Sequence, residues 1–220
     1  MKHLTLVPIK QVSVSKSRLR QSGFLTDDDI QILVSRMFNH VIDCIKEFSP
    51  FGVISPDPSL LEDAKAKGAN FIYQDHGYDL NLSLDAALQS MWEMKSNWES
   101  VLILMADLPL LTTKEYEKML NRFLAEGNVG LVPADKEFSP TTGTSGLFIP
   151  RRWKEYIRLA FGKNSFSAFV TQFKQSGIPY AIHSSLLGYD VDTFDDLKFV
   201  TQLGMPSIKG SPSFVRGNNE

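Results

Sequence analysis

Short apolar runs separated by helical stripes constrain the fold of this chain more than any other feature. Residues 101–106 form the longest uninterrupted apolar run, which has the length of a single strand. Such a run indicates a strand that is covered on both faces. Similar candidate strands recur at residues 4–9, 52–55, 69–73 and 129–133, with helical segments between them. This alternation predicts an α/β fold, a three-layer sandwich with a mostly parallel central sheet.

The helical segments are predicted from apolar residues three and four positions apart. The first begins after Thr26, which forms a candidate capping box with Asp29; a second covers residues 83–95, and Thr112 or Thr113 caps a third. The remaining expected elements are a strand at 146–149, helices at 153–161 and 166–175, a strand at 180–184 and a helix at 193–203. We expect one domain over residues 1–203. Residues 204–220, rich in Gly, Pro and Ser, are expected to form a flexible or partner-contacting tail.

Composition excludes several classes of protein. With 43% hydrophobic and 22% charged residues, the chain is of ordinary globular type. No apolar run approaches the roughly 20 residues that span a bilayer, and the N-terminus lacks a signal-peptide pattern, so we expect a cytoplasmic protein without a membrane partner. The net charge of −2 argues against nucleic acid as a partner. The single cysteine, Cys44, is interpreted as a core residue, and a homodimer is expected.

The first 26 residues contain five basic side chains and no acidic one. These basic residues are Lys2, Lys10, Lys16, Arg18 and Arg20. Most of them follow the first candidate strand, and open α/β sheets bind ligands at the carboxyl ends of their strands. A solvated loop explains such residues equally well, and neither G-x-x-x-x-G-K-[ST] nor G-x-G-x-x-G is present. The loop is therefore a candidate site for a phosphate group, but not of a P-loop or Rossmann type.

Acidic residues occur at two further strand ends. Asp107 comes directly after the apolar run 101–106, and Asp190 and Asp192 are spaced i, i+2 in a segment expected to be extended. Three carboxylates that converge near phosphate oxygens would suit Mg²⁺. Alternatively, Asp107 is a turn residue and Asp192 is the N-cap of the last helix. The four histidines have no spacing that suggests zinc, and no G-x-S-x-G elbow is present.

Two small-residue loops could bind an anion through backbone N–H groups. Residues 141–146 contain two glycines, and residues 161–165 precede a predicted helix whose amino end favours negative charge. A hairpin turn and an ordinary helix cap explain these loops separately.

Taken together, these stretches resemble the 2-phospho-L-lactate guanylyltransferases of coenzyme F-420 biosynthesis, which have a GT-A-type nucleotidyltransferase fold. The likeness covers residues 7–197. It rests on Pro8-Ile9-Lys10, Lys16-Ser17-Arg18-Leu19, Ser55-Pro56-Asp57-Pro58, Leu80-Asn81, Ala106-Asp107-Leu108-Pro109-Leu110, Gly143-Thr144, Phe161-Gly162 with Ser165, and Asp190-Val191-Asp192-Thr193. The order and spacing of these elements are specific in combination.

The resemblance implies roles for individual residues. Nucleotide binding would fall to Pro8, Lys10, Lys16, Arg18, Asn81 and Asp107, with Lys16, Arg18 and Asp107 also catalytic. Magnesium would be bound by Asp107, Asp190 and Asp192, and the acceptor by Thr144, Gly162 and Ser165. The substrates would be GTP and a phosphorylated three-carbon acid. The chain departs from the family pattern at Asp79 and in residues 141–146, which leaves the shape of the acceptor pocket open.

Other functions fit part of the same pattern. Another GT-A nucleotidyltransferase could load a nucleotide on molybdopterin or on a sugar phosphate. A non-catalytic nucleotide-binding module would keep the fold and bind without turnover. A glycosyltransferase also needs acidic metal ligands, for its nucleotide-sugar donor.

Overall fold

The computed structural model describes residues 2–77, 79–94, 97–134, 142–185 and 188–203. Its centre is a seven-stranded sheet in the order β3-β2-β1-β4-β6-β5-β7. The strands are β1 (His3–Pro8), β2 (Phe51–Ser55), β3 (Phe71–Gln74), β4 (Ser100–Leu104), β5 (Val129–Pro133), β6 (Thr144–Pro150) and β7 (Tyr180–Ile182). Only β6 runs antiparallel to its neighbours among these strands. The expected α/β fold with a mostly parallel sheet is confirmed.

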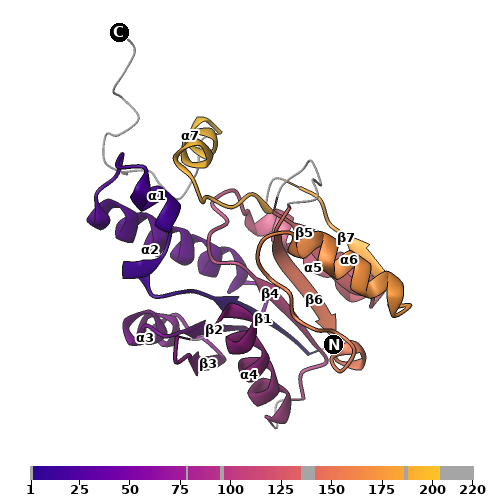
Figure 1. Ribbon diagram of the computed structural model, residues 1–220. Coiled ribbons are helices and arrows are strands. Elements are labelled where there is room, and N and C mark those ends of the chain that lie inside the picture. The colour runs from indigo at the N-terminus through magenta and orange to yellow at the C-terminus, as the bar shows by residue number, and fades with distance from the viewer. Residues whose placement is uncertain (1, 78, 95–96, 135–141, 186–187, 204–220) are drawn as a thin grey trace.

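Helices cover both faces of the sheet, as Figure 1 shows. The helices are α1 (Ser17–Gln21), α2 (Asp27–Ile45), α3 (Pro58–Ala66), α4 (Leu80–Glu93), α5 (Thr113–Glu126), α6 (Ser165–Gln175) and α7 (Phe194–Gln202). The apolar residues of α2, α3, α5 and α7 form one core with the sheet, and those of α4 and α6 form the other. Two cores on one sheet make the three-layer arrangement that the sequence predicts.

Capping residues in the sequence predict where two of the helices, α2 and α5, begin. Thr26 accepts a hydrogen bond from the Asp29 amide, and the Asp29 carboxylate accepts one from the Thr26 amide, which confirms the capping box at α2. Of the two candidate caps for α5, the structure uses Thr112. Each cap satisfies amides that the first turn of a helix leaves free.

Two expectations from the sequence are wrong. The helix predicted at 153–161 is a single 3-10 turn, Arg151–Trp153, and residues 157–161 have no regular structure. The last helix is capped by Thr193, not by Asp192, because the Thr193 hydroxyl accepts from the Asp196 amide and the Asp196 carboxylate accepts from the Thr193 amide. This second difference leaves the Asp192 carboxylate available for other contacts.

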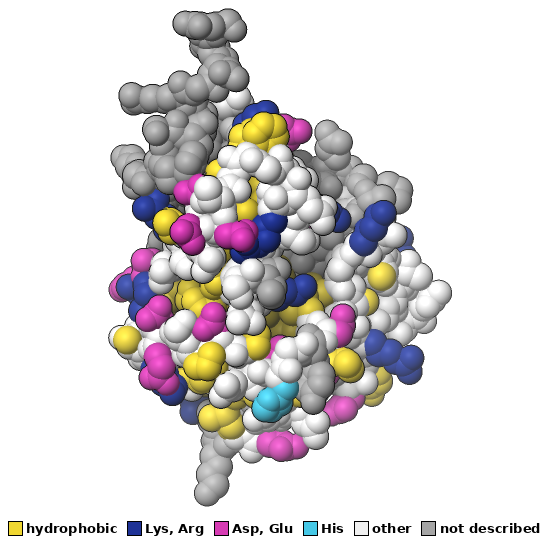
Figure 2. Space-filling model, turned by 60° about the vertical axis from the view of Figure 1, so that its left-hand side comes forward, with side chains coloured by type: hydrophobic (Ala, Val, Ile, Leu, Met, Phe, Trp, Pro, Cys, Tyr) yellow, Lys and Arg dark blue, Asp and Glu magenta, His cyan; other side chains and the backbone are white. Residues whose placement is uncertain are grey.

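The expected tail, residues 204–220, lies outside the described residues. Within the described residues, no helix combines the length with the apolar character that crossing a bilayer requires. Figure 2 shows basic and acidic side chains interspersed over one face of the molecule.

Candidate active site

The loop after β1 directs a lysine into the protein at the carboxyl edge of the sheet. Lys16 is the residue before α1 and has left-handed backbone angles, φ 56° and ψ 47°. Such angles are costly for a residue other than glycine, and they occur most often at functional sites. Arg20 fixes the loop, since its guanidinium donates to the carbonyl oxygens of Ser15 (3.0 Å) and Val12 (3.2 Å) and pairs with Asp27. Sequence reasoning assigned Arg20 no role beyond its charge, because these bonds go to backbone oxygens.

The Lys16 ammonium contacts two of the three predicted acidic residues. It pairs with an oxygen of Asp107, which follows β4, and lies 2.9 Å from an oxygen of Asp192, which precedes α7. Burial alone would lower the pKa of Lys16, but the two carboxylates outweigh burial and hold its pKa above the ordinary value. Lys16 is therefore a fixed positive charge between residues that are 91 and 176 positions away in the sequence.

Asp190 completes the acidic cluster. One carboxylate oxygen of each of Asp107, Asp190 and Asp192 lies within 4.8 Å of the other two. Burial first, and then the negative charges of Asp107 and Asp192, raise the pKa of Asp190 to about 7. A group whose charge is disfavoured by its neighbours in this way is stabilised by an added cation. The three clustered carboxylates therefore form an oxygen donor set that fits a hard divalent cation, beside the buried Lys16 ammonium.

Asp192 differs from Asp190 because cations surround it. Burial raises the pKa of Asp192, but Lys16 first, and then Arg18 and Lys10, lower it by a larger amount, so that its pKa lies below the ordinary value. The Arg18 guanidinium lies 3.6 Å from the Asp192 carboxylate and is largely exposed. The predicted phosphate-binding residues Lys10, Lys16 and Arg18 thus act electrostatically on a single carboxylate.

Close packing of Gly188 fixes the segment that carries Asp190 and Asp192. A Cβ atom on Gly188 would lie 2.2 Å from the carbonyl oxygen of Pro133, at the end of β5, so no other residue fits there without a shift of backbone. The Ser145 hydroxyl donates to the Gly188 carbonyl oxygen at 2.6 Å. These two contacts hold the start of the acidic segment against the sheet.

Ser145 also joins the acidic cluster to the predicted acceptor residues. Its carbonyl oxygen accepts from the Met105 amide at 2.9 Å, two residues before Asp107. Its neighbour Thr144 begins β6, and the Thr144 hydroxyl lies 3.0 Å from the Ser165 hydroxyl at the start of α6. The two predicted sites are therefore adjacent, and no motif in the sequence indicates this link through Ser145.

The loop before α6 brings an exposed glycine next to the start of the helix. Asn164 precedes the helix with φ 64°, and its side chain makes no capping hydrogen bond. The Ser165 amide donates to the Gly162 carbonyl oxygen at 3.1 Å, and Gly162 is exposed with φ 131°. Gly162, Thr144 and Ser165 thus lie together, as the resemblance implies, at the positive end of an eleven-residue helix.

Asn81, predicted to lie near the nucleoside, is committed to another contact. Its amide nitrogen donates to the carbonyl oxygen of Phe161 at 3.0 Å, and its amide oxygen accepts from the Phe161 N–H at 2.7 Å. These two hydrogen bonds to the backbone of Phe161 join the first turn of α4 to the loop before α6. Pro8, the last predicted nucleotide-binding residue, is buried at the end of β1 and pairs in register with Ile54.

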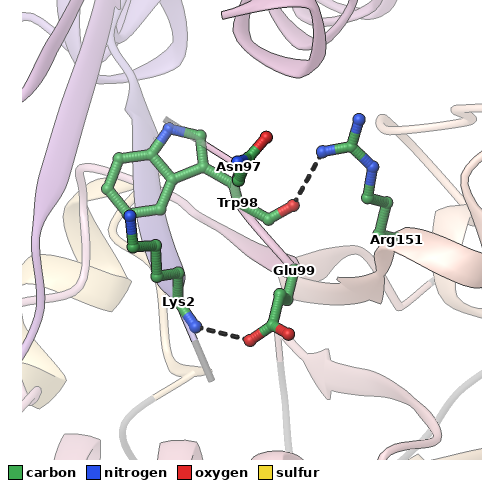
Figure 3. A pocket seen from close by; sticks show the side chains of 5 residues that line it. All are labelled: Lys2, Asn97, Trp98, Glu99 and Arg151. Carbon is green, nitrogen blue, oxygen red and sulfur yellow. Dashed lines mark hydrogen bonds between the residues drawn. The ribbon is translucent and has the colours of Figure 1, made fainter. Parts of the chain in front are cut away.

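Two surface hollows formed by the described residues lie elsewhere. One of about 580 Å³ is lined by Lys2, Asn97, Trp98, Glu99 and Arg151, shown in Figure 3, and one of about 770 Å³ lies near residues 46–51 and 66–70. Both lie at the amino ends of strands β1 to β4, and Arg151 reaches the first from the end of the antiparallel β6. In the first hollow, the backbone N–H of Lys2 donates to Glu99 and Arg151 donates to the Trp98 carbonyl oxygen. The chemistry-bearing residues are thus at the edge opposite to these hollows.

Comparisons with known proteins agree with this geometry. A family model described as "Guanylyl transferase CofC like" matches residues 3–207. The chain is 29% identical to a phosphoenolpyruvate guanylyltransferase of Sphaerobacter thermophilus, over 90% of this chain and 92% of that protein. It is 30% identical to a 2-phospho-L-lactate guanylyltransferase of Methanosarcina acetivorans, over 87% and 83% of the two chains. It is 25% identical to a 3-phospho-D-glycerate guanylyltransferase of Colwellia psychrerythraea, over 91% and 92%.

Solved structures share the fold at low sequence identity. The 4-diphosphocytidyl-2C-methyl-D-erythritol synthase of Anaerococcus prevotii superposes with a TM-score of 0.60 at 11% identity, over 92% of this chain and 95% of that one. A nucleotidyl transferase from a Methanothermobacter species has the same TM-score at 10% identity, over 99% of each chain. The nucleotidyltransferase type of fold expected from the resemblance is confirmed.

Proposed function

This chain belongs to the CofC-like guanylyltransferase family, and from this premise we propose that it transfers GMP from GTP to a phosphorylated three-carbon acid. The acceptor is 2-phospho-L-lactate or phosphoenolpyruvate. With the former, the products are lactyl-2-diphospho-5'-guanosine and pyrophosphate, in coenzyme F-420 biosynthesis. One observation carries the proposal: Lys16 and the cluster of Asp107, Asp190 and Asp192 lie next to the loop of Thr144 and Ser165.

The reaction needs little from the protein beyond position and charge. A phosphate oxygen of the acceptor attacks the α-phosphorus of GTP, the bond from that phosphorus to the oxygen bridging to the β-phosphate breaks, and pyrophosphate leaves. A phosphate monoester has a second pKa of about 6, so it is already ionised near neutral pH and requires no general base. A site made of cations, carboxylates and backbone amides, without a catalytic triad, suits such a reaction.

The residues divide into two groups on this proposal. Lys16, Arg18 and Lys10 would neutralise the triphosphate of GTP, since all three already act on the charge of Asp192. Thr144, Ser165 and the backbone at Gly162 would bind the phosphate and carboxylate of the acceptor. Ser145 joins the segment that carries Asp190 and Asp192 to the acceptor residues, so the acceptor would lie beside the α-phosphate.

The acidic cluster is the proposed magnesium site. Asp107, Asp190 and Asp192 would hold the ion, and the observation in favour of it is that one oxygen of each lies within 4.8 Å of the other two. When bound, Mg²⁺ supplies neutralisation of the negative charge that gathers on the phosphates in the transition state.

Pyrophosphate release tests the proposal. GTP, ATP and CTP would each be incubated with Mg²⁺ and one acceptor. The acceptors are 2-phospho-L-lactate, phosphoenolpyruvate and 3-phospho-D-glycerate, with molybdopterin and a sugar phosphate for comparison. We expect release with GTP and one of the first two. Release only with a molybdopterin or sugar-phosphate acceptor would favour another nucleotidyltransferase, and saturable GTP binding without release under any acceptor would favour a binding module.

The homodimer and the cytoplasmic location stay predictions. Sedimentation velocity of the full chain would measure the first, and fractionation of expressing cells would measure the second.

A further inference from the structure

An unpaired carboxylate oxygen lies at the carboxyl edge of the sheet, away from the acidic cluster. Oδ1 of Asp75 is buried and has no hydrogen-bond partner. Asp75 comes directly after β3, so it is at the same edge as Asp107, which follows β4. A buried acceptor without a donor costs about 1–3 kcal/mol. Orphaned groups of this kind therefore require an explanation, and a bound ligand is one.

The loop that carries Asp75 is fixed at both ends. The Asp75 amide donates to the Ser55 carbonyl oxygen at 3.0 Å, which extends the pairing of β3 with β2 by one residue. At the other end, the Asp79 carboxylate accepts from the Asn81 amide at 2.9 Å and caps α4. The side chain of Asp75 is half-buried on this fixed backbone. Rotation about its Cα–Cβ bond to another staggered position would turn both carboxylate oxygens toward the surface.

The position of Asp75 fits a nucleotide whose phosphates lie at the acidic cluster. In the strand order β3-β2-β1-β4, three steps separate the strand before Asp75 from the strand before Asp107. At about 4.8 Å for each step, the two strand ends are about 14 Å apart along the edge. That separation matches the reach of a nucleotide from its phosphates to the far edge of its base, and the phosphate-binding loop after β1 lies between them.

We propose that Asp75 reads the guanine base of the donor nucleotide, with its two carboxylate oxygens accepting hydrogen bonds from N1–H and the N2 amino group. The inference rests on the proposed function, because it requires GTP as the donor. A carboxylate can only accept hydrogen bonds. Guanine presents two adjacent donors on its Watson–Crick edge, whereas adenine and cytosine each present one donor beside a ring nitrogen acceptor. Asp75 therefore selects guanine by attraction and rejects the other two bases by repulsion.

An exchange of specificity tests the assignment. Xanthine carries an oxygen in place of the N2 amino group, so an amide side chain suits it better than a carboxylate does. We expect Asp75→Asn to lower kcat/KM for GTP by about 10- to 100-fold and to raise kcat/KM for XTP, so that the preference between the two reverses. We also expect the unchanged protein to use ITP, which lacks the amino group, more weakly than GTP.

Asp79→Asn is the matched control. It removes the same charge from the same loop, and asparagine caps a helix as well as aspartate does. This variant should keep the preference of the parent for GTP over XTP. Thermal unfolding of both variants would show that each is folded.

The outcomes separate the inference from the function on which it rests. If the parent protein uses GTP and Asp75→Asn gains nothing for XTP, the role of Asp75 is wrong and the proposed function stands. If the parent releases no pyrophosphate from GTP with any of the acceptors, the proposed function itself fails, and the inference fails with it.

Discussion

The polar side chains at the two edges of the sheet differ in charge: those at the amino edge form a neutral hydrogen-bonded network, and those at the carboxyl edge form a charged cluster. At the amino edge, Thr5 lies at the centre of a neutral network, 2.7 Å from the Tyr116 hydroxyl, 3.0 Å from His3 and 3.3 Å from Ser49. The other ring nitrogen of His3 lies 3.1 Å from Ser100, so both ring nitrogens of this histidine have partners. At the carboxyl edge, charged groups gather instead, and the pKa of Asp190 is raised to about 7 by burial and by the negative charges of Asp107 and Asp192.

This difference separates residues that stabilise the fold from residues that bind a ligand. A satisfied neutral network needs nothing from outside the protein, and it fixes one arrangement of the core. A cluster with excess charge of one sign is costly alone and favourable once a counter-charge binds, which is why strongly shifted pKa values are typical of functional sites. Substitutions at the carboxyl edge are therefore expected to lower turnover, and substitutions at the amino edge to lower the free energy of unfolding.

The largest effect is expected at the carboxyl edge. Asp107→Asn should lower kcat by about 100- to 1000-fold, because the site loses a carboxylate that positions charge near the reacting phosphate. The free energy of unfolding should change by less than about 1 kcal/mol, since Lys16 keeps Asp192 as a partner and Asp190 loses a repulsive neighbour. Pyrophosphate release and urea unfolding measure the two quantities. Turnover near that of the parent would contradict the assignment of this edge as the active site.

The reverse result is expected at the amino edge. Thr5→Val preserves the shape of the side chain but leaves the Tyr116 hydroxyl, His3 and Ser49 without their shared partner. We expect a loss of about 2–3 kcal/mol in the free energy of unfolding, with kcat for the folded protein unchanged. The same two assays apply. A comparable loss of turnover in Thr5→Val would mean that the two edges do not divide stability from activity.

Acid should weaken the amino edge first. Burial lowers the pKa of His3 from 6.5 to about 3, so the folded protein keeps His3 neutral while the unfolded chain takes up a proton below pH 6.5. The stability that this residue contributes is complete above pH 6.5 and is lost as the pH falls toward 3, by about 1.4 kcal/mol for each pH unit.

Urea unfolding at pH 7 and pH 5 would measure the loss, which should be about 2 kcal/mol over the interval below pH 6.5. His3→Gln keeps hydrogen-bonding groups in the side chain but cannot titrate, so it serves as the control. The variant should lose less stability than the parent between the two pH values. Equal losses in both proteins would show that other groups set the acid sensitivity.

The sequence predicts the frame of the site better than its contacts. Apolar runs of strand length place Asp107 at a strand end, and i, i+2 spacing places Asp190 and Asp192 together, because both signals are local. The bonds of Arg20 to backbone oxygens and the bridge through Ser145 depend on residues far apart in the sequence. No spacing or composition encodes such contacts, since they exist only after the sheet has formed.

Asn81 shows how a tertiary contact changes the role that a motif implies. By resemblance it lies near the nucleoside, but both groups of its side-chain amide are bonded to the backbone of Phe161, one residue before Gly162. Asn81→Ala should therefore loosen the loop that precedes α6. We expect the KM for the acceptor to rise by about 10-fold, which corresponds to the loss of one or two hydrogen bonds, with the KM for GTP unchanged.

Ser83→Ala is the matched control, because Ser83 lies in the same first turn of α4 and its hydroxyl donates only to the Asp79 carbonyl oxygen among the bonds found for it, at 3.1 Å. This variant should change neither KM. If Asn81→Ala raises the KM for GTP and leaves that for the acceptor unchanged, the role implied by the resemblance holds. The contact with Phe161 would then serve to hold Asn81 toward the nucleotide instead of holding the loop toward the acceptor.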